Sequence, residues 1–190
     1  DITATDYIPK KPTYTISNLN YDLTQEEDSQ LCSFNISIQD VANQKNYYRL
    51  IVRARKTFNN TATSCIYEVY DPSFLIPINR YNPSNSFFKG KNGYFTDELF
   101  EGEEKNFYVT VNKPEGIFDH LSIEVISYSE KLYNFNLTRK EQKRDSNNIL
   151  FNSEAIFIES NIEGGYGIFG GRSRSRRAYG PTYPDNGVEY

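Results

Sequence analysis

The chain has 190 residues, which is enough for one or at most two domains. Its 21 lysines and arginines against 25 aspartates and glutamates give a net charge of −4, which argues against a nucleic-acid partner because such partners require a basic surface. No segment approaches the ~18 consecutive apolar residues of a membrane-spanning helix. Tyrosine and phenylalanine make up 15% of the chain, and with valine and isoleucine they favour strands over helices.

The first part of the chain predicts strands. Residues 1–12 form an extended polar leader that contains prolines. After the leader, apolar and polar residues alternate, as they do in strands with one buried face. Because short polar loops join the last three of these strands, we expect them to form an antiparallel meander. The expected strands are residues 13–23, 31–41, 47–58 and 64–71.

The meander decides what is expected of the two cysteines, Cys32 and Cys65. In that arrangement both lie opposite Arg55, on either side of the middle strand and roughly 9 to 10 Å apart. A disulfide requires Cα atoms within about 7 Å of each other. We therefore expect two buried free thiols, and a disulfide would refute the meander.

The rest of the chain predicts further strands and one helix. Residues 130–143 lose the alternation and are rich in helix formers, so we expect a helix there with Ser129 as its N-cap. The tail at 178–190 has no periodic pattern and is expected to be irregular. The chain thus divides into the leader, a single β-sandwich domain at 13–177 and the tail. Further strands are expected at 106–113, 118–129 and 149–162, with a short edge strand at 74–78.

The segment SNIEGGYGIFGGRSRSRR, residues 160–177, combines glycines with four arginines. A Walker-type phosphate loop needs a lysine and a hydroxyl residue after the glycines, whereas GGRSRS follows here. The GYGIFG spacing fits a dinucleotide loop, but no amphipathic helix follows it, as that loop requires. Arginine-rich RNA binding is a third alternative, which the acidic body opposes.

The interpretation that fits the flanking alternation is a turn between two strands. Asn161, Gly164 and Gly165 are the residues expected at positive φ, which glycine and asparagine tolerate best. A return strand that packs on the core is expected to begin at Ile168 and Phe169. Exposed tyrosines stack on sugars or bind protein edges, and the candidates are Tyr166, Tyr179 and Tyr183. The alternative, which we favour, is that most of the 16 tyrosines and 13 phenylalanines simply belong to the core.

A second candidate site is the stretch TDELFEGEE, in which five carboxylates follow one another closely. Calcium binds clustered carboxylate and carbonyl oxygens, so Asp97, Glu101 and Glu103 form an alternative calcium site. The spacing is not that of an EF-hand, and a solvated acidic loop is the simpler interpretation. No other metal and no cofactor is predicted.

The sequence gives little support to catalysis. Hydrolytic triads need a histidine or another base, and the single histidine, His120, stands beside Asp119 at the start of an expected strand. A zinc site needs several histidine or cysteine ligands, which the chain lacks. We therefore expect a protein that is not an enzyme.

Four motifs in order, NYYRL, FTDELFEG, YSEKLYNF and SNIEGGYGIFGG, extend from about Tyr47 to Gly171. Together they resemble the C-terminal domain of a family of Bacteroidetes cell-envelope lipoproteins, domain of unknown function 4249. The closing glycine motif is the most specific of the four. The chain departs from the family pattern at FNSEAIF, where members often have an Asp-Pro-Phe-like stretch, and in its arginine-rich end.

The resemblance implies properties that the residues alone do not give. It implies a lipid anchor upstream of this chain, an additional N-terminal β-sandwich domain and a place at the outer membrane, surface-exposed or facing the periplasm. It also implies a TonB-dependent β-barrel transporter as a partner, with a role in nutrient uptake. The family supplies no catalytic residues.

The expected fold is therefore an all-β, mainly antiparallel β-sandwich with one short helix at 130–143. The expected function is a non-enzymatic binding or accessory domain of an outer-membrane lipoprotein that works with such a transporter. The alternative is a structural or adhesive protein-interaction module of a cell-envelope assembly. The candidate partner-binding residues are Asp97, Glu98, Glu101, Tyr166, Arg172 and Arg174.

Overall fold

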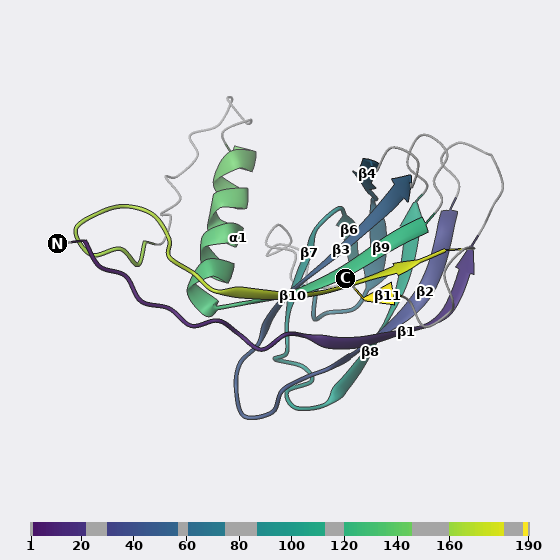
Figure 1. Ribbon diagram of the computed structural model, residues 1–190, viewed down its shortest axis with the longest axis horizontal. Coiled ribbons are helices and arrows are strands. Elements are labelled where there is room, and N and C mark those ends of the chain that lie inside the picture. The colour runs from purple at the N-terminus through teal and green to yellow at the C-terminus, as the bar shows by residue number, and fades with distance from the viewer. Residues whose placement is uncertain are drawn as a thin grey trace.

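Two antiparallel sheets pack face to face, and the one helix among the described residues stands beside them, as the sequence predicts (Figure 1). The computed structural model describes residues 2–21, 30–56, 61–74, 87–112, 120–145, 160–180 and 188–189. No helix among these residues is long and apolar enough to cross a membrane.

The five-stranded sheet has the order β1-β2-β8-β5-β6, and all its pairs are antiparallel. Its strands are β1 (Thr13–Tyr21), β2 (Gln30–Gln39), β5 (Tyr67–Tyr70), β6 (Phe87–Gly90) and β8 (Glu104–Asn112).

The six-stranded sheet has the order β11-β10-β9-β3-β4, and β7 also pairs with β3. These pairs are antiparallel as well. Its strands are β3 (Tyr47–Lys56), β4 (Thr61–Ser64), β7 (Gly93–Thr96), β9 (His120–Tyr128), β10 (Arg172–Tyr179) and β11 (Val188–Glu189).

The predicted meander is wrong, because β2 and β3 lie in different sheets. Alternation shows which face of a strand is buried, but both sheets of a sandwich bury one face, so it does not identify the neighbouring strand. The single strand expected at 64–71 is also divided. Ser64 ends β4 in one sheet, and Tyr67 begins β5 in the other. The chain crosses between the sheets at Cys65 and Ile66. The Cys65 N–H donates to the carbonyl of Val52 (2.9 Å), and the Ile66 carbonyl accepts the N–H of Asn112 (2.9 Å).

Both cysteines are fully buried and unpaired, as expected. The expected geometry was wrong all the same. Cys32 belongs to β2 in one sheet, and Cys65 lies at the crossover between the two sheets. The free thiols are therefore confirmed without the meander that predicted them.

Tyrosine hydroxyls tie the two sheets together inside an aromatic-rich core. The Tyr14 hydroxyl on β1 donates to the carbonyl of Ile123 on β9 at 2.7 Å. The Tyr67 hydroxyl on β5 donates to the carbonyl of Leu50 on β3 at 2.6 Å. Since these oxygens are buried, each bond satisfies two polar groups that would otherwise destabilise the core.

The helix α1 (Glu130–Asp145) begins where the sequence predicts and ends two residues later. Ser129 is its N-cap, because its carbonyl accepts the N–H of Tyr133 at 2.9 Å. The helix packs on the outer face of the six-stranded sheet, through a second cluster of buried residues that is separate from the main core. Its members are Tyr47, Ile51, Tyr94, Ile126, Tyr128 and Tyr133.

Several local predictions need correction or fall outside the described residues. Ala178 and Tyr179 belong to β10 and residues 188–189 form β11, so the tail is not irregular at these positions. Of the expected edge strand at 74–78, Phe74 forms an isolated bridge with Phe95, and the rest lies outside the described residues. The strands expected at 149–162 lie almost wholly outside them too.

Candidate partner-binding surface

The leader and the glycine-rich loop run side by side and project from the sandwich as an arm, defined here as residues 2–12 and 160–171 (Figure 1). Thr3 and Glu163 join them in an antiparallel bridge. The N–H of Glu163 donates to the carbonyl of Thr3 at 2.9 Å, and the Thr3 N–H donates in return at 3.4 Å. The leader is therefore part of the folded domain.

Asp6 anchors the base of the arm. Its Oδ2 accepts the hydroxyl of Ser129 and the backbone N–H of Gly171. A Cβ at Gly171 would lie 1.9 Å from the carbonyl oxygen of Tyr7, so only glycine allows the two backbones to approach this closely. Ser173 adds a hydrogen bond of 2.7 Å to the carbonyl of Lys10.

The side chain of Asn161 holds the glycine loop closed. Its Nδ2 donates to the carbonyl of Phe169 at 2.6 Å, and its Oδ1 accepts the Phe169 N–H at 2.9 Å. Gly164 (φ 77°) has the positive φ predicted for it, whereas Asn161 and Gly165 do not, and Gly167 (φ 135°) does instead. The asparagine acts through its side chain, which a prediction based on backbone preference misses.

The return strand begins at Arg172 and not at Ile168 and Phe169. Phe169 is exposed and does not pack on the core. The reason is that the Asn161 side chain makes both of its hydrogen bonds to the backbone of Phe169, which holds Phe169 within the loop.

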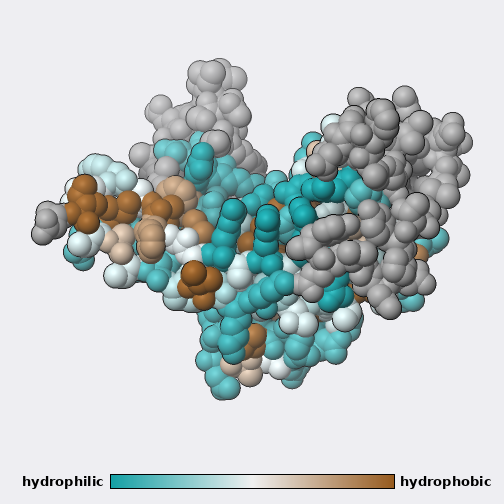
Figure 2. Space-filling model, viewed as in Figure 1, coloured by the Kyte–Doolittle hydropathy of each residue, from teal (hydrophilic) through white to brown (hydrophobic). Residues whose placement is uncertain are grey.

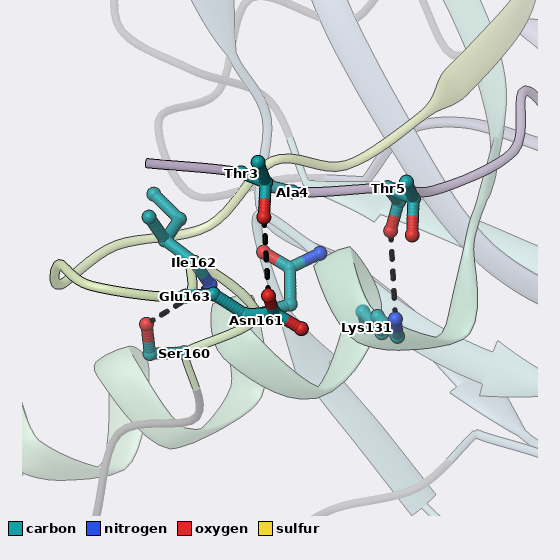
Figure 3. A pocket seen from close by; sticks show the side chains of 8 residues that line it. All are labelled: Thr3, Ala4, Thr5, Lys131, Ser160, Asn161, Ile162 and Glu163. Carbon is teal, nitrogen blue, oxygen red and sulfur yellow. Dashed lines mark hydrogen bonds between the residues drawn. The ribbon is translucent and has the colours of Figure 1, made fainter. Parts of the chain in front are cut away.

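A polar hollow of about 390 Å³ opens between the arm and the start of α1 (Figure 3). Its polar groups bond largely to one another. The Lys131 ammonium donates to the carbonyl of Thr5 at 3.4 Å, and the Thr3 hydroxyl donates to Glu163 at 3.1 Å. The lining residues are Thr3, Ala4, Thr5, Lys131, Ser160, Asn161, Ile162 and Glu163.

Large apolar side chains are also exposed on the arm. Figure 2 shows apolar residues gathering on the end of the molecule that the arm forms. Tyr166, a predicted partner-binding residue, is fully exposed at the tip of the glycine loop. We call this set the apolar arm surface: Ile2, Tyr7, Ile8, Tyr166 and Phe169.

The family model described as Domain of unknown function (DUF4249) matches residues 2–178. The chain belongs to the DUF4249 family. No curated protein and no solved structure gives a significant match. The match covers both the leader and the glycine loop, so the arm is part of the DUF4249 domain.

The acidic loop of the DUF4249 domain is in part structural. Asp97 is 1% exposed, and its Oδ2 accepts the backbone N–H (2.7 Å) and the side-chain Nδ2 (3.0 Å) of Asn46. Burial raises the pKa of Asp97 and the carboxylate of Asp40 adds to the rise, although the hydrogen bonds from Asn46 oppose it. Asp40 itself accepts the N–H of Gly102 at 2.8 Å. The position of Asp97 therefore supports a role in holding this loop and does not support partner binding.

The other predicted residues of this loop are accessible. Glu98 pairs with Lys45 at 2.5 Å, and both side chains are about half exposed. Glu101 and Glu103 are exposed. Across the described part of the chain, no three His, Cys, Asp or Glu side chains are grouped as a metal ion requires, so the alternative calcium site at Asp97, Glu101 and Glu103 is not supported.

The arginine-rich segment is a strand that pairs with β9 along its whole length. Arg172 and Arg174 are exposed. The Arg174 guanidinium lies 4.0 Å from the buried carboxylate of Glu124, whose other oxygen pairs with Arg53 at 2.6 Å. The carboxylate of Glu124 on β9 thus lies between the guanidinium groups of Arg53 and Arg174. Both predicted arginines, Arg172 and Arg174, remain accessible to solvent.

Sequence reasoning missed Ile2, Tyr7 and Ile8, which the polar leader carries as its exposed apolar side chains. Large apolar residues in a segment without a strand or helix pattern are the signal that points to them. Among the predicted tyrosines, Tyr179 is buried, and Tyr183 lies outside the described residues.

Proposed function

We propose that this DUF4249 domain is a non-enzymatic binding or accessory domain of an outer-membrane lipoprotein, located at the cell surface or facing the periplasm. In this proposal it works with a TonB-dependent transporter in nutrient uptake, and the apolar arm surface is the contact with that partner. The transporter is the proposed partner because the motifs of this chain resemble those of lipoproteins that accompany such transporters.

The observation that carries the proposal is the apolar arm surface. Large apolar side chains that are exposed together on one part of a domain mark sites of interaction with proteins or membranes. Aromatic side chains are enriched at the centres of such contacts, and Tyr7, Tyr166 and Phe169 supply three here. The arm is held in shape by Asp6, Asn161 and the Thr3–Glu163 bridge, so this surface is presented without a large ordering cost.

The absence of enzymatic activity is part of the proposal, and the thiols support it. Burial raises the pKa of the Cys65 thiol to about 11, and it raises the pKa of the Cys32 thiol further. A nucleophilic cysteine needs an accessible thiolate, so neither residue is suited to covalent catalysis. His120 is the single histidine in the sequence, so it is the one histidine that could act as the base of a hydrolytic triad.

The test is to purify the full-length lipoprotein from native membranes and identify by mass spectrometry what accompanies it. We expect a β-barrel transporter in stoichiometric amount. The double variant Tyr166→Ser/Phe169→Ser should reduce its recovery by roughly tenfold, because exposed aromatic anchors carry much of the binding energy of interfaces. The matched control is Tyr108→Ser, an exposed tyrosine on the sandwich.

Three outcomes would count against the proposal. Recovery of the lipoprotein alone would contradict a stable partner. Equal recovery of the transporter with the double variant would exclude the arm as the contact. Recovery of other envelope proteins, lost in the double variant, would favour the alternative of a structural or adhesive module.

A further inference from the structure

A row of aromatic side chains lies on the outer face of the five-stranded sheet, apart from the arm. Tyr70 on β5 is 72% exposed and Tyr108 on β8 is 57% exposed. Each stands one position beyond the paired residues Val69 and Val109, so the two side chains lie on the same face of neighbouring strands. On its other side Tyr70 pairs with Phe87 of β6, and the two ring centres are 4.4 Å apart.

The three rings lie on the neighbouring strands β6, β5 and β8, and two of them, Tyr70 and Phe87, are in contact. Because adjacent strands are about 4.8 Å apart, the row spans roughly 10 Å from Phe87 to Tyr108. The inward-facing neighbours, such as Val69 and Val109, are fully buried in the core. The rings therefore rest on the outer face of a packed sheet, where Tyr70 and Tyr108 are exposed and Phe87 is half-buried.

Small neutral polar side chains continue and flank the platform. The row extends from Tyr108 to Asn35 on β2 and then to Ser17 on β1. Asn106 and Thr110 precede and follow Tyr108 at the next outward positions of the same strand. Amide and hydroxyl groups both donate and accept hydrogen bonds, as the hydroxyls of a sugar do.

We propose that this face binds a neutral oligosaccharide, with the Phe87–Tyr70–Tyr108 row as its stacking platform. A pyranose ring has an apolar face of C–H groups that stacks on an aromatic ring, and an edge of hydroxyls that needs neutral donors and acceptors. A buried protein interface would instead favour more large apolar residues around the rings. Two charges at the next outward positions, Lys89 and Glu68, pair with each other at 2.7 Å, and Asp71 beside Tyr70 pairs with Lys105 at 3.0 Å, which suits a neutral ligand.

This inference goes beyond the proposed function and does not rest on it, since the row belongs to the sandwich and the apolar arm surface to the arm (Figure 1). Each of the two proposals can also be refuted while the other stands. A domain that binds a transporter through the arm retains that contact when Tyr70 or Tyr108 is changed, and a domain that binds sugar retains that binding when Tyr166 is changed.

The test is affinity electrophoresis of the complete chain in native gels that contain a soluble polysaccharide. The probes are hydroxyethyl cellulose, xylan, glucomannan and glycogen, with alginate as a charged comparison. We expect at least one neutral polysaccharide to retard the chain, and Tyr70→Ala or Tyr108→Ala to weaken that binding roughly tenfold. Tyr70→Phe should retain it because the ring is kept, and the control Leu99→Ala, at an exposed apolar side chain outside both surfaces, should leave it unchanged.

Retardation that is lost in the alanine variants and kept in Tyr70→Phe supports the proposal, provided that circular dichroism shows the variants folded. Four results would overturn it: no retardation by any neutral polysaccharide, retardation by alginate alone, equal retardation of the Tyr70→Ala and Tyr108→Ala variants, or a dimer of the chain in solution that Tyr108→Ala dissociates. The last result would make the row a protein interface.

Discussion

Replacing Asp97 tests whether this carboxylate is a structural clamp, as its position indicates. Asp97→Ala removes both hydrogen bonds to Asn46 and leaves the Asn46 N–H without its acceptor in a buried place. Hydrogen bonds to a charged group contribute roughly 1.5 to 3 kcal/mol each. Burial raises the pKa of Asp97, so the hydrogen bonds do not fully offset the cost of burying its charge. The lower value of this range therefore applies to each bond. We expect a loss of about 3 kcal/mol in the free energy of unfolding.

Asp97→Asn separates the hydrogen bonds from the charge. The amide oxygen still accepts both bonds from Asn46, and the variant no longer buries a carboxylate. We therefore expect it to remain within about 1 kcal/mol of the wild type, whereas Asp97→Ala should lower the melting temperature by roughly 6 to 12 °C in a domain of this size. Urea unfolding followed by circular dichroism measures both free energies.

The same pair of variants predicts a pH dependence. The pKa of Asp97 is raised above its ordinary value of 3.8 in the folded chain, so between these two values the folded state holds more protons than the unfolded state. Stability from this group is then greatest below pH 3.8 and falls as the pH rises to the folded-state pKa. The wild type should lose stability relative to Asp97→Asn across that window and keep a constant difference above it.

Two results would refute this reasoning. If Asp97→Ala unfolds within about 0.5 kcal/mol of the wild type, the hydrogen bonds to Asn46 do not hold the loop. If Asp97→Asn is as destabilised as Asp97→Ala, the negative charge itself is required, and the position would again be a candidate for binding a cation.

Three further predictions follow from particular contacts. Gly171→Ala should cost about 1 to 3 kcal/mol and make the leader more sensitive to limited proteolysis, because its Cβ meets the Tyr7 carbonyl oxygen; a leader equally protected in the variant would contradict this contact. Tyr14→Phe should cost about 1 kcal/mol in urea unfolding by removing the bond to Ile123, and an unchanged midpoint would show that this bond contributes nothing. With a pKa of about 11, the Cys65 thiol should react with a thiol reagent at pH 8 more than about a hundredfold more slowly in the folded chain than in urea, and equal rates would refute its burial.

The sequence predicts the elements of this domain better than their arrangement. Alternation correctly located β2, β3, β8 and β9, and the loss of alternation correctly located α1. These signals are local, since each depends on which residues of one segment face the core. The pairing of β2 with β8 and of β3 with β9 depends on contacts between distant segments, and alternation carries no information on them.

The sites were predicted less well for a related reason. Tyr166 is exposed as expected, because a tyrosine in a glycine-rich turn has little to pack against. Asp97 is buried although it belongs to a run of acidic residues, because Asn46, which is distant in the sequence, supplies its hydrogen bonds. The row formed by Tyr70 and Tyr108 exists only once β5 and β8 are paired, so no pattern within either strand reveals it.

The way the leader is attached is the reason why we propose the arm as a binding surface. A segment that serves only its own fold normally packs its apolar side chains inward, because that burial supplies most of the stabilisation. Here the attachment is polar: Asp6 accepts the N–H of Gly171, and Ser173 donates to the carbonyl of Lys10. Tyr7 and Ile8, next to these contacts, remain exposed. Their apolar area is therefore available to a second molecule, and burying it there at about 25 cal/mol per Å² would stabilise a complex without any change in the domain.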